Sequence, residues 1–451
     1  MFATVSRRGS RRCRCAWRAG GLAVCLWAAA VCAGHAAAPD TLTLQQALER
    51  VMSHNPGLQA WPLRQAALDG DRAGAALLPP LRLSADAENF AGSGDADGLD
   101  GIEITLALSG VVEFGSRPAA RVAIVDGRAE RLDAEQRAAQ LDVLAEAARG
   151  YIALAARQHA LALARDRLEL RRQVRASVAQ RVQRGRAPAA EQARAEAAVV
   201  RAGLEVAHVE HQIPALRTQL AALWGDRQAD FERVQDRSLF EPGSAGRLPA
   251  LLAALEHTPD LARFNSELRL AQAQLRLEQS RAQGELGWRA GVKRIEATES
   301  TALVAGVSLP LGARARAAGP VRAARARADA AAQDRDAALV RSRALLVEQF
   351  QHRSHAIDEV RVLRQRVIPL LEQAVADTRA AWARGRYSYL ELSAALDELM
   401  TARLALIDAA ERAHLRRVEL ERLAGAALQP QPAGAAGDPP ASARETAHDA
   451  H

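Results

Sequence analysis

The feature that most constrains this chain is a very long helical segment that ends at a glycine turn. From Gly319-Pro320 to Arg384, roughly 65 residues are mostly Ala, Arg, Leu, Val, Glu and Gln, a composition that strongly favours helix. At ~1.5 Å per residue, such a helix would be about 100 Å long. The turn Arg384-Gly385-Arg386 follows, and a second helical run returns as far as Gly425. We therefore predict a helical hairpin far longer than those of ordinary globular domains.

The same order of features occurs earlier in the chain. A helical run begins at Pro118, turns at Arg184-Gly185-Arg186 and returns to Gly225. The turn glycines Gly185 and Gly385 are 200 residues apart, and so are the end glycines of the two return runs. An internal repeat of this kind indicates two copies of one structural unit.

The first 38 residues have the pattern of a secretory signal peptide. Arginines gather near the start, Gly20–Ala33 is apolar, and Ala36-Ala37-Ala38 offers a small-residue cleavage site. The formal net charge is +7, but six arginines and no acidic residue fall in this segment, so the remaining chain is near neutral and indicates no nucleic-acid partner. The remaining chain also has no disulfide or thiolate metal ligand, because all four cysteines lie in the signal: Cys13, Cys15, Cys25 and Cys32.

Two stretches alternate apolar and polar residues, which is the pattern of β-strands. Residues 81–112 contain two such runs joined by an acidic, glycine-rich loop, and residues 286–311 contain two more. Runs of about ten residues with one apolar and one polar face are typical of outer-membrane barrel strands. Four strands cannot close a barrel, so this interpretation requires two chains for about eight strands or three chains for about twelve. The alternative is two amphipathic hairpins packed on a soluble core.

These features divide the chain into five segments. We predict a signal peptide, a first repeat, an equatorial connector, a second repeat and a disordered tail, at residues 1–38, 39–225, 226–247, 248–425 and 426–451. Each repeat contains a helix, a β-hairpin and a long helical hairpin, so the fold class is mainly α with a small β part. We expect Pro214 and Pro369 to bend their helices. In the second long helix, apolar residues at coiled-coil spacing predict a packed seam: Leu339, Leu346, Phe350, Ile357, Val360, Val367 and Leu371.

Helix, strand hairpin, long helix, tip and return helix, all repeated, resemble the TolC family of outer-membrane efflux proteins over essentially the whole mature chain. Its local signatures here are Leu42-Thr43-Leu44 through Asn55-Pro56, a glycine-centred tip in each half, and the strand end Val307-Ser308-Leu309-Pro310-Leu311. The resemblance implies a homotrimer in the outer membrane of a Gram-negative cell, with a twelve-stranded β-barrel on a twelve-helix α-barrel tunnel. It also implies two protein partners, a periplasmic adaptor (membrane fusion) protein and an inner-membrane resistance-nodulation-division (RND) pump.

Within that family, the chain looks most like the CzcC-type branch, which serves efflux of cobalt, zinc, cadmium and related cations by RND pumps. Glu88-Asn89, the glycine-rich loop and Glu103–Arg121 carry this likeness. Gly115-Ser116-Arg117 departs from it, because that branch usually has a Gly-Gly-Lys-Arg-like turn. The implied function is passive export of divalent heavy-metal cations. Outer-membrane drug efflux, type I protein secretion and a periplasmic coiled-coil scaffold are the alternatives.

The two tips supply the candidate functional residues. Glycine suits a tight helical reversal, and arginine suits the C-terminus of a helix. The resemblance further implies that the residues of both tips contact the adaptor: Arg184, Gly185, Arg186, Arg384, Gly385 and Arg386. Glu191 and Glu391 follow the tip glycines at positions where the family has acids near the periplasmic entrance, and three copies of Glu391 would form a cation-selecting ring. The alternative is an ordinary first-turn glutamate. At the aperture, where TolC-like gates place a tyrosine and an arginine, this chain has Trp382 and Tyr387.

Two histidine pairs have the i,i+3 spacing at which a helix could hold a metal, His208/His211 and His352/His355. The sequence positions no third ligand, so solvated or packed histidines are the better interpretation, and we assign no metal site and no cofactor. The sequence also lacks a phosphate-binding loop after a strand, an HExxH motif and a nucleophile elbow, which argues against an enzyme.

Overall fold

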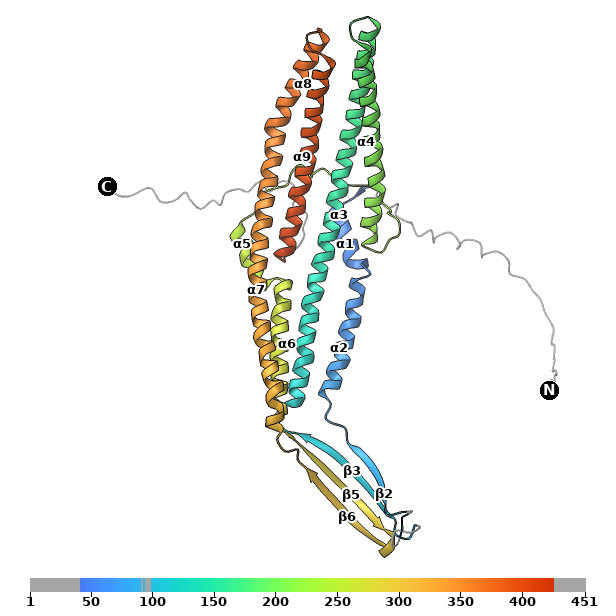
Figure 1. Ribbon diagram of the computed structural model, residues 1–451, viewed down its shortest axis with the longest axis vertical. Helices are drawn as coiled ribbons and strands as arrows, with labels where there is room; N and C mark the ends of the chain where they lie inside the picture. Colours follow the sequence, from blue (N-terminus) through green and yellow to red (C-terminus); the bar gives the residue numbers. More distant parts are fainter. Residues whose placement is uncertain (1–40, 91, 94–98, 426–451) are drawn as a thin grey trace, which may run out of the picture. The chain divides into compact units, whose positions relative to one another are not determined.

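The computed structural model describes residues 41–90, 92–93 and 99–425. The predicted signal peptide (1–38) and tail (426–451) lie outside the described residues. The described chain is mainly helical, as predicted, and one four-stranded sheet joins the helices at one end (Figure 1). Among these residues, no helix combines the length and the apolar character needed to cross a bilayer.

The first half of the described chain contains four helices and the first two strands of the large sheet. Thr43 starts the first helix with a capping box, in which its hydroxyl accepts from the Gln46 N–H and the Gln46 side chain accepts from the Thr43 N–H. The predicted break at Asn55-Pro56 ends that helix. The element bounds are α1 Leu44–His54, α2 Trp61–Ala76, β2 Arg82–Glu88, β3 Glu103–Glu113, α3 Arg117–Gln183 and α4 Ala189–Ala222.

The second half repeats this order after a short helix, α5 (Leu248–Ala254). Its elements are α6 Pro259–Arg281, β5 Glu285–Ile295, β6 Ser300–Ser308, α7 Ala313–Val362, α8 Ile368–Ala383 and α9 Tyr389–Leu423. Strand β6 ends three residues before the predicted residue 311, because Pro310 has no N–H to extend the ladder.

The predicted start of the second long helix at Gly319-Pro320 is wrong. Helix α7 begins six residues earlier, at Ala313, and includes Pro320. Residues 313–318 are only alanine and arginine, which are strong helix formers. Gly312, in the left-handed conformation with φ 75°, precedes the first turn. A proline this close to the start removes one backbone hydrogen bond, and the favourable residues on both sides offset that loss.

The two prolines inside the rods have different effects. Helix α4 continues through Pro214. Ahead of Pro369, the chain forms a wider π-helical segment, Leu363–Val367, between α7 and α8. The wider turn makes room for the proline ring, which would otherwise collide with the carbonyl one turn earlier. In the predicted seam of this rod, Leu346 and Val360 are buried and the remaining members are half-buried.

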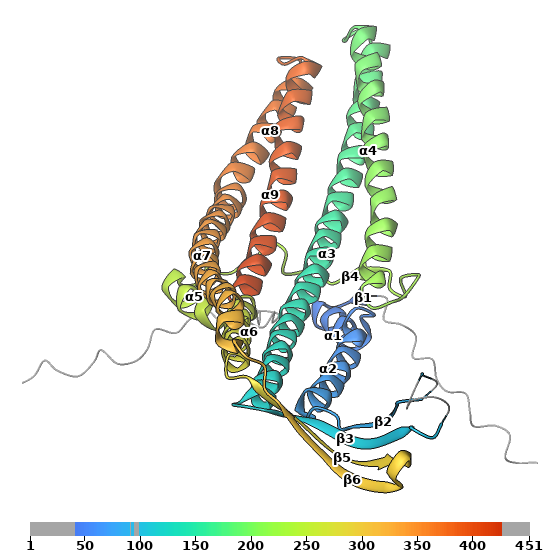
Figure 2. The same ribbon diagram turned by 60° about the horizontal axis from the view of Figure 1, so that its bottom comes forward.

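Helix α3 is the central helix of the described chain. At the sheet end it lies between α2 and α6, with α7 on the other side of α6 (Figures 1 and 2). At the opposite end it lies between α4 and α9, with α8 on the other side of α9. One row of helices therefore ends at α2 and α7, and the other ends at α4 and α8.

The large sheet is antiparallel throughout, in the order β2-β3-β5-β6, so β2 and β6 are its edges. Residues that pair across its strands share a face. Leu106, Val292 and Leu303 pair at one level, and their side chains are 52%, 45% and 88% exposed. One face is therefore apolar and uncovered in the described chain.

The opposite face of the sheet is polar. Arg289 pairs with Asp86, and the Lys293 ammonium lies between the carboxylates of Glu88 and Glu103. In the middle of this face, the strands approach so closely that a Cβ on Gly291 would lie 2.6 Å from the carbonyl oxygen of Leu106. The alternation of the sequence thus produces one lipid-compatible face and one charged face.

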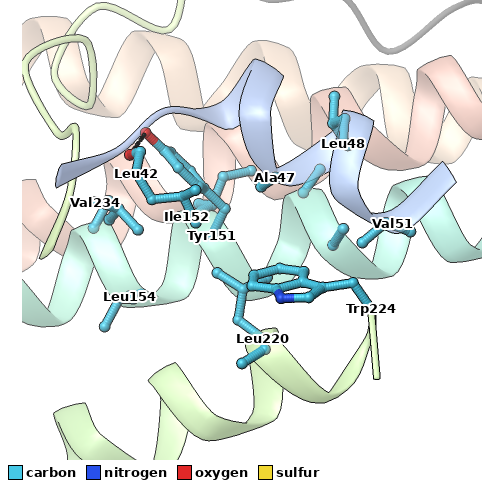
Figure 3. Packing of buried hydrophobic residues seen from close by; sticks show 14 of the residues in the cluster. Leu42, Ala47, Leu48, Val51, Tyr151, Ile152, Leu154, Leu220, Trp224 and Val234 are labelled. Atoms are coloured by element: carbon cyan, nitrogen blue, oxygen red, sulfur yellow. Dashed lines mark hydrogen bonds between the residues drawn. The ribbon is translucent and has the colours of Figure 1, made fainter. Parts of the chain in front are cut away.

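The connector 226–247 is not wholly irregular. Its strand β4 (Arg233–Val234) pairs in parallel with β1 (Thr41–Leu42). Tyr151 on α3 holds both segments, since its hydroxyl donates to the carbonyls of Gln235 (2.7 Å) and Leu42 (3.3 Å). Figure 3 shows the contact with Leu42. Around this contact, Trp224 and buried residues of α1, α3 and α4 form a hydrophobic core.

Candidate functional site

The two helix tips have the same backbone geometry. At the first tip, Gly185 has φ 68° and donates its N–H to the Val182 carbonyl (2.9 Å), while Arg186 donates its N–H to the Arg181 carbonyl (2.8 Å). This is the Schellman ending of a helix, which needs a left-handed residue and therefore favours glycine. The flanking Arg184 and Arg186 side chains are exposed.

The second tip repeats these contacts 200 residues later. Gly385 has φ 77° and donates its N–H to the Trp382 carbonyl (2.9 Å), and Arg386 donates its N–H to the Ala381 carbonyl (3.0 Å). Arg384 and Arg386 are exposed, as their counterparts are at the first tip. Four arginine side chains are thus available to a partner at the ends of the two hairpins.

The Arg181 side chain joins the two tips. Arg181, in the last turn of α3, donates to the Trp382 carbonyl on α8, and its guanidinium lies 4.8 Å from the centre of the Trp382 ring. Trp382 itself is buried in a cluster with Val178 and Leu392. A cation over an aromatic face attracts the ring's negative charge density, so this contact holds one hairpin against the other.

The carboxylates predicted near the tips have different environments. Glu391 forms a capping box with Ser388, whose backbone N–H (2.6 Å) and hydroxyl (2.8 Å) both donate to one Glu391 oxygen. These two hydrogen bonds lower the pKa of Glu391, so the side chain stays ionised. Glu191 lies in the first turn of α4 without such a contact to Pro188, its cap residue. Tyr387 is exposed at the second tip.

Ion pairs follow the seam between α3 and α9. Arg149 pairs with Glu419 (2.6 Å), and Arg157 pairs with Glu411 (3.3 Å). Nearer the tips, Asp397 on α9 accepts from two arginines of α3, Arg167 (2.9 Å) and Arg171. Arg171 also donates to the Ser393 hydroxyl (3.0 Å) and is only 5% exposed. These ion pairs therefore add to the packing of buried apolar residues between α3 and α9.

The connector is fastened to α7 and α9 by buried polar side chains. Arg353 on α7 donates to the carbonyls of Pro242 (3.3 Å) and Ala245 (3.2 Å), and His414 on α9 contacts the Leu239 carbonyl (3.0 Å). Burial, and then the nearby Arg417 guanidinium, lowers the pKa of His414 to about 4. His414 is therefore neutral and can donate one ring N–H to the connector.

The two histidine pairs show no sign of shared metal chemistry. His208 contacts its neighbour Gln212 (2.9 Å), and both members of each pair, His208/His211 and His352/His355, are exposed. Within the described ranges, no three His, Cys, Asp or Glu side chains gather in a way that could hold a metal ion.

Comparison with known proteins identifies a matching family. The model of the family described as "Outer membrane efflux protein" matches residues 44–226, from the start of α1 through the end of α4. The first half of the chain therefore resembles the outer membrane efflux proteins. The resemblance to the TolC family is thereby confirmed, and so is the expected location in the outer membrane.

The chain is similar over most of its length to one curated protein and to several solved structures. The cobalt-zinc-cadmium resistance protein CzcC of Cupriavidus metallidurans is 24% identical over 394 residues, which cover 86% of this chain and 91% of CzcC. The structure of VceC from Vibrio cholerae is 20% identical with a TM-score of 0.70, covering 86% of this chain and 97% of VceC. The structure of CusC is 16% identical with a TM-score of 0.73, covering 85% of this chain and 92% of CusC. At these identities, the two structures show a common fold.

Sequence reasoning did not find Arg181. The residue lies four positions before the first tip glycine, and the 200-residue repeat places it opposite Ala381, so nothing in the second half marks it. Its role depends on how the two hairpins meet. A repeat in the sequence gives the shape of each hairpin but not the contact between them.

Proposed function

We propose that this protein is the exit channel of a tripartite RND efflux system and exports divalent heavy-metal cations. The observation that carries the proposal is the four-stranded sheet, which has two free edges, an uncovered apolar face and a charged face. Free edges are not stable in lipid, so the sheet requires further strands from other copies. Three copies give about twelve strands, a number within the range of known membrane barrels.

The ends of the helical rows support the same assembly. Val200 and Leu204, one turn apart on α4, are 63% and 67% exposed, and Leu370 on α8 is 67% exposed. Helices α4 and α8 end the row at the tip end, so α4 of one chain would lie against α8 of the next. Such head-to-tail contacts close into a ring of identical chains. We propose that the two halves, 39–225 and 248–425, are repeats that alternate around this ring as a homotrimer.

The tips are the proposed point of contact with the periplasmic adaptor, which links the channel to the inner-membrane pump. The arginines flanking Gly185 and Gly385 are exposed there, and the backbone turns that carry them have the same hydrogen-bonded geometry. The contact between Arg181 and Trp382 would keep the hairpins closed until the adaptor binds.

Glu391 is the proposed cation-selecting residue of the aperture. Its ionised carboxylate lies one residue from the exposed Leu390, close to the tip. Glu391→Gln tests this role cleanly, because glutamine also serves in a capping box and only the charge is lost. We expect lower cation selectivity of the channel in planar bilayers. Glu191→Gln tests the other predicted aperture carboxylate in the same way, and an unchanged reversal potential for Glu391→Gln would remove Glu391 from the aperture.

The likeness to CzcC supports a metal substrate, and a deletion strain tests it directly. We expect sensitivity to one or two of zinc, cobalt, cadmium, nickel and copper, restored by the full-length gene. Drugs and detergents are scanned in parallel. Sensitivity to drugs with unchanged metal tolerance would reject the metal substrate and leave a drug-efflux channel.

A further inference from the structure

The segment that joins β6 to α7 is strongly basic. Residues 309–328 contain no acidic residue and five arginines, all exposed: Arg314, Arg316, Arg322, Arg325 and Arg327. None of the ion pairs within the described residues involves them. The matching junction of the first half is different, since Arg117 and Arg121 of α3 both contact the carboxylate of Glu113. The positive charge at the start of α7 therefore has no partner in the described chain.

The apolar face of the sheet is too short to span the hydrocarbon layer alone. It runs from the Leu106–Val292 pair to the Val112–Leu286 pair, six residues along the strand, or about 20 Å at ~3.4 Å per residue. Barrel strands are tilted, so the height covered is smaller still, whereas the apolar band of such barrels is about 25 Å tall. Apolar side chains must therefore extend the band past one end of the sheet.

Exposed leucines do so at the junction with the helices. Leu309 and Leu311, directly after β6, are 56% and 81% exposed, and Leu77 and Leu78, ahead of β2, are 69% and 74% exposed. At the other end of the sheet, Arg294 lies on the apolar face and ends the band. The leucines thus place the inner boundary of the hydrocarbon layer at the first residues of α7.

Arg314 and Arg316 lie just past this boundary. They follow Leu311 by three and five residues, or about 5–8 Å at ~1.5 Å per residue. Arg316 donates to the Leu311 carbonyl, so its guanidinium is turned back toward the sheet. Figure 1 shows α7 beginning directly beside the end of β6. Both arginines are therefore at the depth of lipid phosphates.

We propose that the first turn of α7 binds the headgroup of an anionic phospholipid in the inner leaflet of the outer membrane. Leu309 and Leu311 contact the acyl chains, and Arg314 and Arg316 bind the phosphate, for which guanidinium is well suited. Unpaired basic residues next to an apolar surface are the usual lipid-headgroup sites of membrane proteins. The inference rests on the proposed insertion of the sheet into the membrane.

A second copy of the chain is the competing partner for this charge. In a ring of chains, α7 would lie beside α2 of the next copy, where Asp69 and Asp71 are exposed. These carboxylates are five and seven residues from the end of α2, which places them one to two turns away from the sheet. Counted from the sheet ends of the two helices at ~1.5 Å per residue, they lie between the levels of Arg316 and Arg322. Arg314 lies nearest the sheet, outside that range, and remains available to lipid.

The test is native mass spectrometry of the full-length protein purified in detergent, with phosphatidylglycerol or phosphatidylcholine added. We expect the wild-type protein to retain phosphatidylglycerol in preference to phosphatidylcholine. The double variant Arg314→Gln/Arg316→Gln should retain it about thirtyfold less strongly, the effect of two arginines at about 1 kcal/mol each. The control Arg325→Gln/Arg327→Gln removes the same charge about 16 Å further along α7 and should bind as the wild type does.

Three results would overturn the inference. Equal retention of the two lipids by the wild type would remove the preference for an anionic headgroup. Equal loss in the two double variants would assign the effect to general charge. A less stable oligomer in Arg314→Gln/Arg316→Gln without added lipid would assign the arginines to the next chain. Failure of the wild type to fractionate with the outer membrane is a separate result, which would reject insertion of the sheet itself.

Discussion

Two glycines on the polar face of the sheet offer a matched test of its construction. A Cβ at Gly291 would lie 2.6 Å from the Leu106 carbonyl oxygen and 2.7 Å from the Ala107 Cβ. A Cβ at Gly306, on the neighbouring strand and the same face, has the Arg289 Cβ at 4.0 Å as its nearest neighbour. Gly291→Ala therefore forces two backbones apart, whereas Gly306→Ala fits without any change.

The difference between the two variants isolates the steric cost. Replacing glycine by alanine in a strand stabilises by roughly 0.5–1 kcal/mol through lower chain entropy, and this gain applies to both sites. Overpacking costs about 1–3 kcal/mol and applies to Gly291 alone. We expect Gly306→Ala to be as stable as the wild type or slightly more so, and Gly291→Ala to be about 1–3 kcal/mol less stable than Gly306→Ala.

Urea unfolding of the purified protein in detergent measures this difference, and the amount of unheated oligomer on a gel gives a second readout. Gly291→Ala should shift the midpoint to lower urea and reduce the amount of folded oligomer in the outer membrane. Equal midpoints for the two alanine variants would contradict the close approach of β3 and β5, and with it the register on which the polar face is based.

Three further predictions concern the helices. Trp382→Phe keeps most of the packing but weakens the contact with Arg181, which is worth about 0.5–2 kcal/mol. Basal conductance in planar bilayers should therefore rise, and an unchanged conductance would argue that this contact does not keep the hairpins closed. Asp397→Asn leaves the buried Arg171 without an anionic acceptor and should destabilise by about 1–3 kcal/mol in urea unfolding, while a neutral effect would mean that the seam is held by packing alone. The pKa of His414 is lowered from its usual 6.5 to about 4. Its contribution to the free energy of unfolding, up to about 3 kcal/mol, is therefore complete above pH 6.5 and is lost as the pH falls toward 4. His414→Gln should flatten the stability profile in that window, and a profile as steep as that of the wild type would exclude His414 as its source.

Much of the fold is visible in the sequence because its parts are locally determined. Gly185 and Gly385 mark the tips, since a helix reversal needs a residue at positive φ, and the alternation in 81–112 and 286–311 gives both hairpins. The start of α7 was predicted wrongly because Gly319-Pro320 resembles the first residues of a helix. Only the surrounding alanines and arginines decide that the helix runs through it.

The contacts between elements could not be read from the sequence. Arg181 reaches Trp382 only because α3 and α8 end at the same level, and β4 pairs with β1 across about 190 residues. Both contacts depend on tertiary placement rather than on local preference. Glu391 is an intermediate case: its position after the tip glycine suggested an aperture residue, and the structure adds a hydrogen-bonding role with Ser388.

The pairing of β1 with β4 has a consequence for the order in which this protein takes shape. Leu42 can pair only once Val234 is in place. Hydrogen bonds from Tyr151 and Gln158, near the middle of α3, hold the two strands. Because closing so long a loop is entropically costly until the intervening helices have formed, this ladder must follow the α3–α4 hairpin. Strand β1, near the start of the chain, is thus among the last segments of its half to be fixed. A chain truncated before residue 233 would form the hairpin and leave β1 without its partner strand.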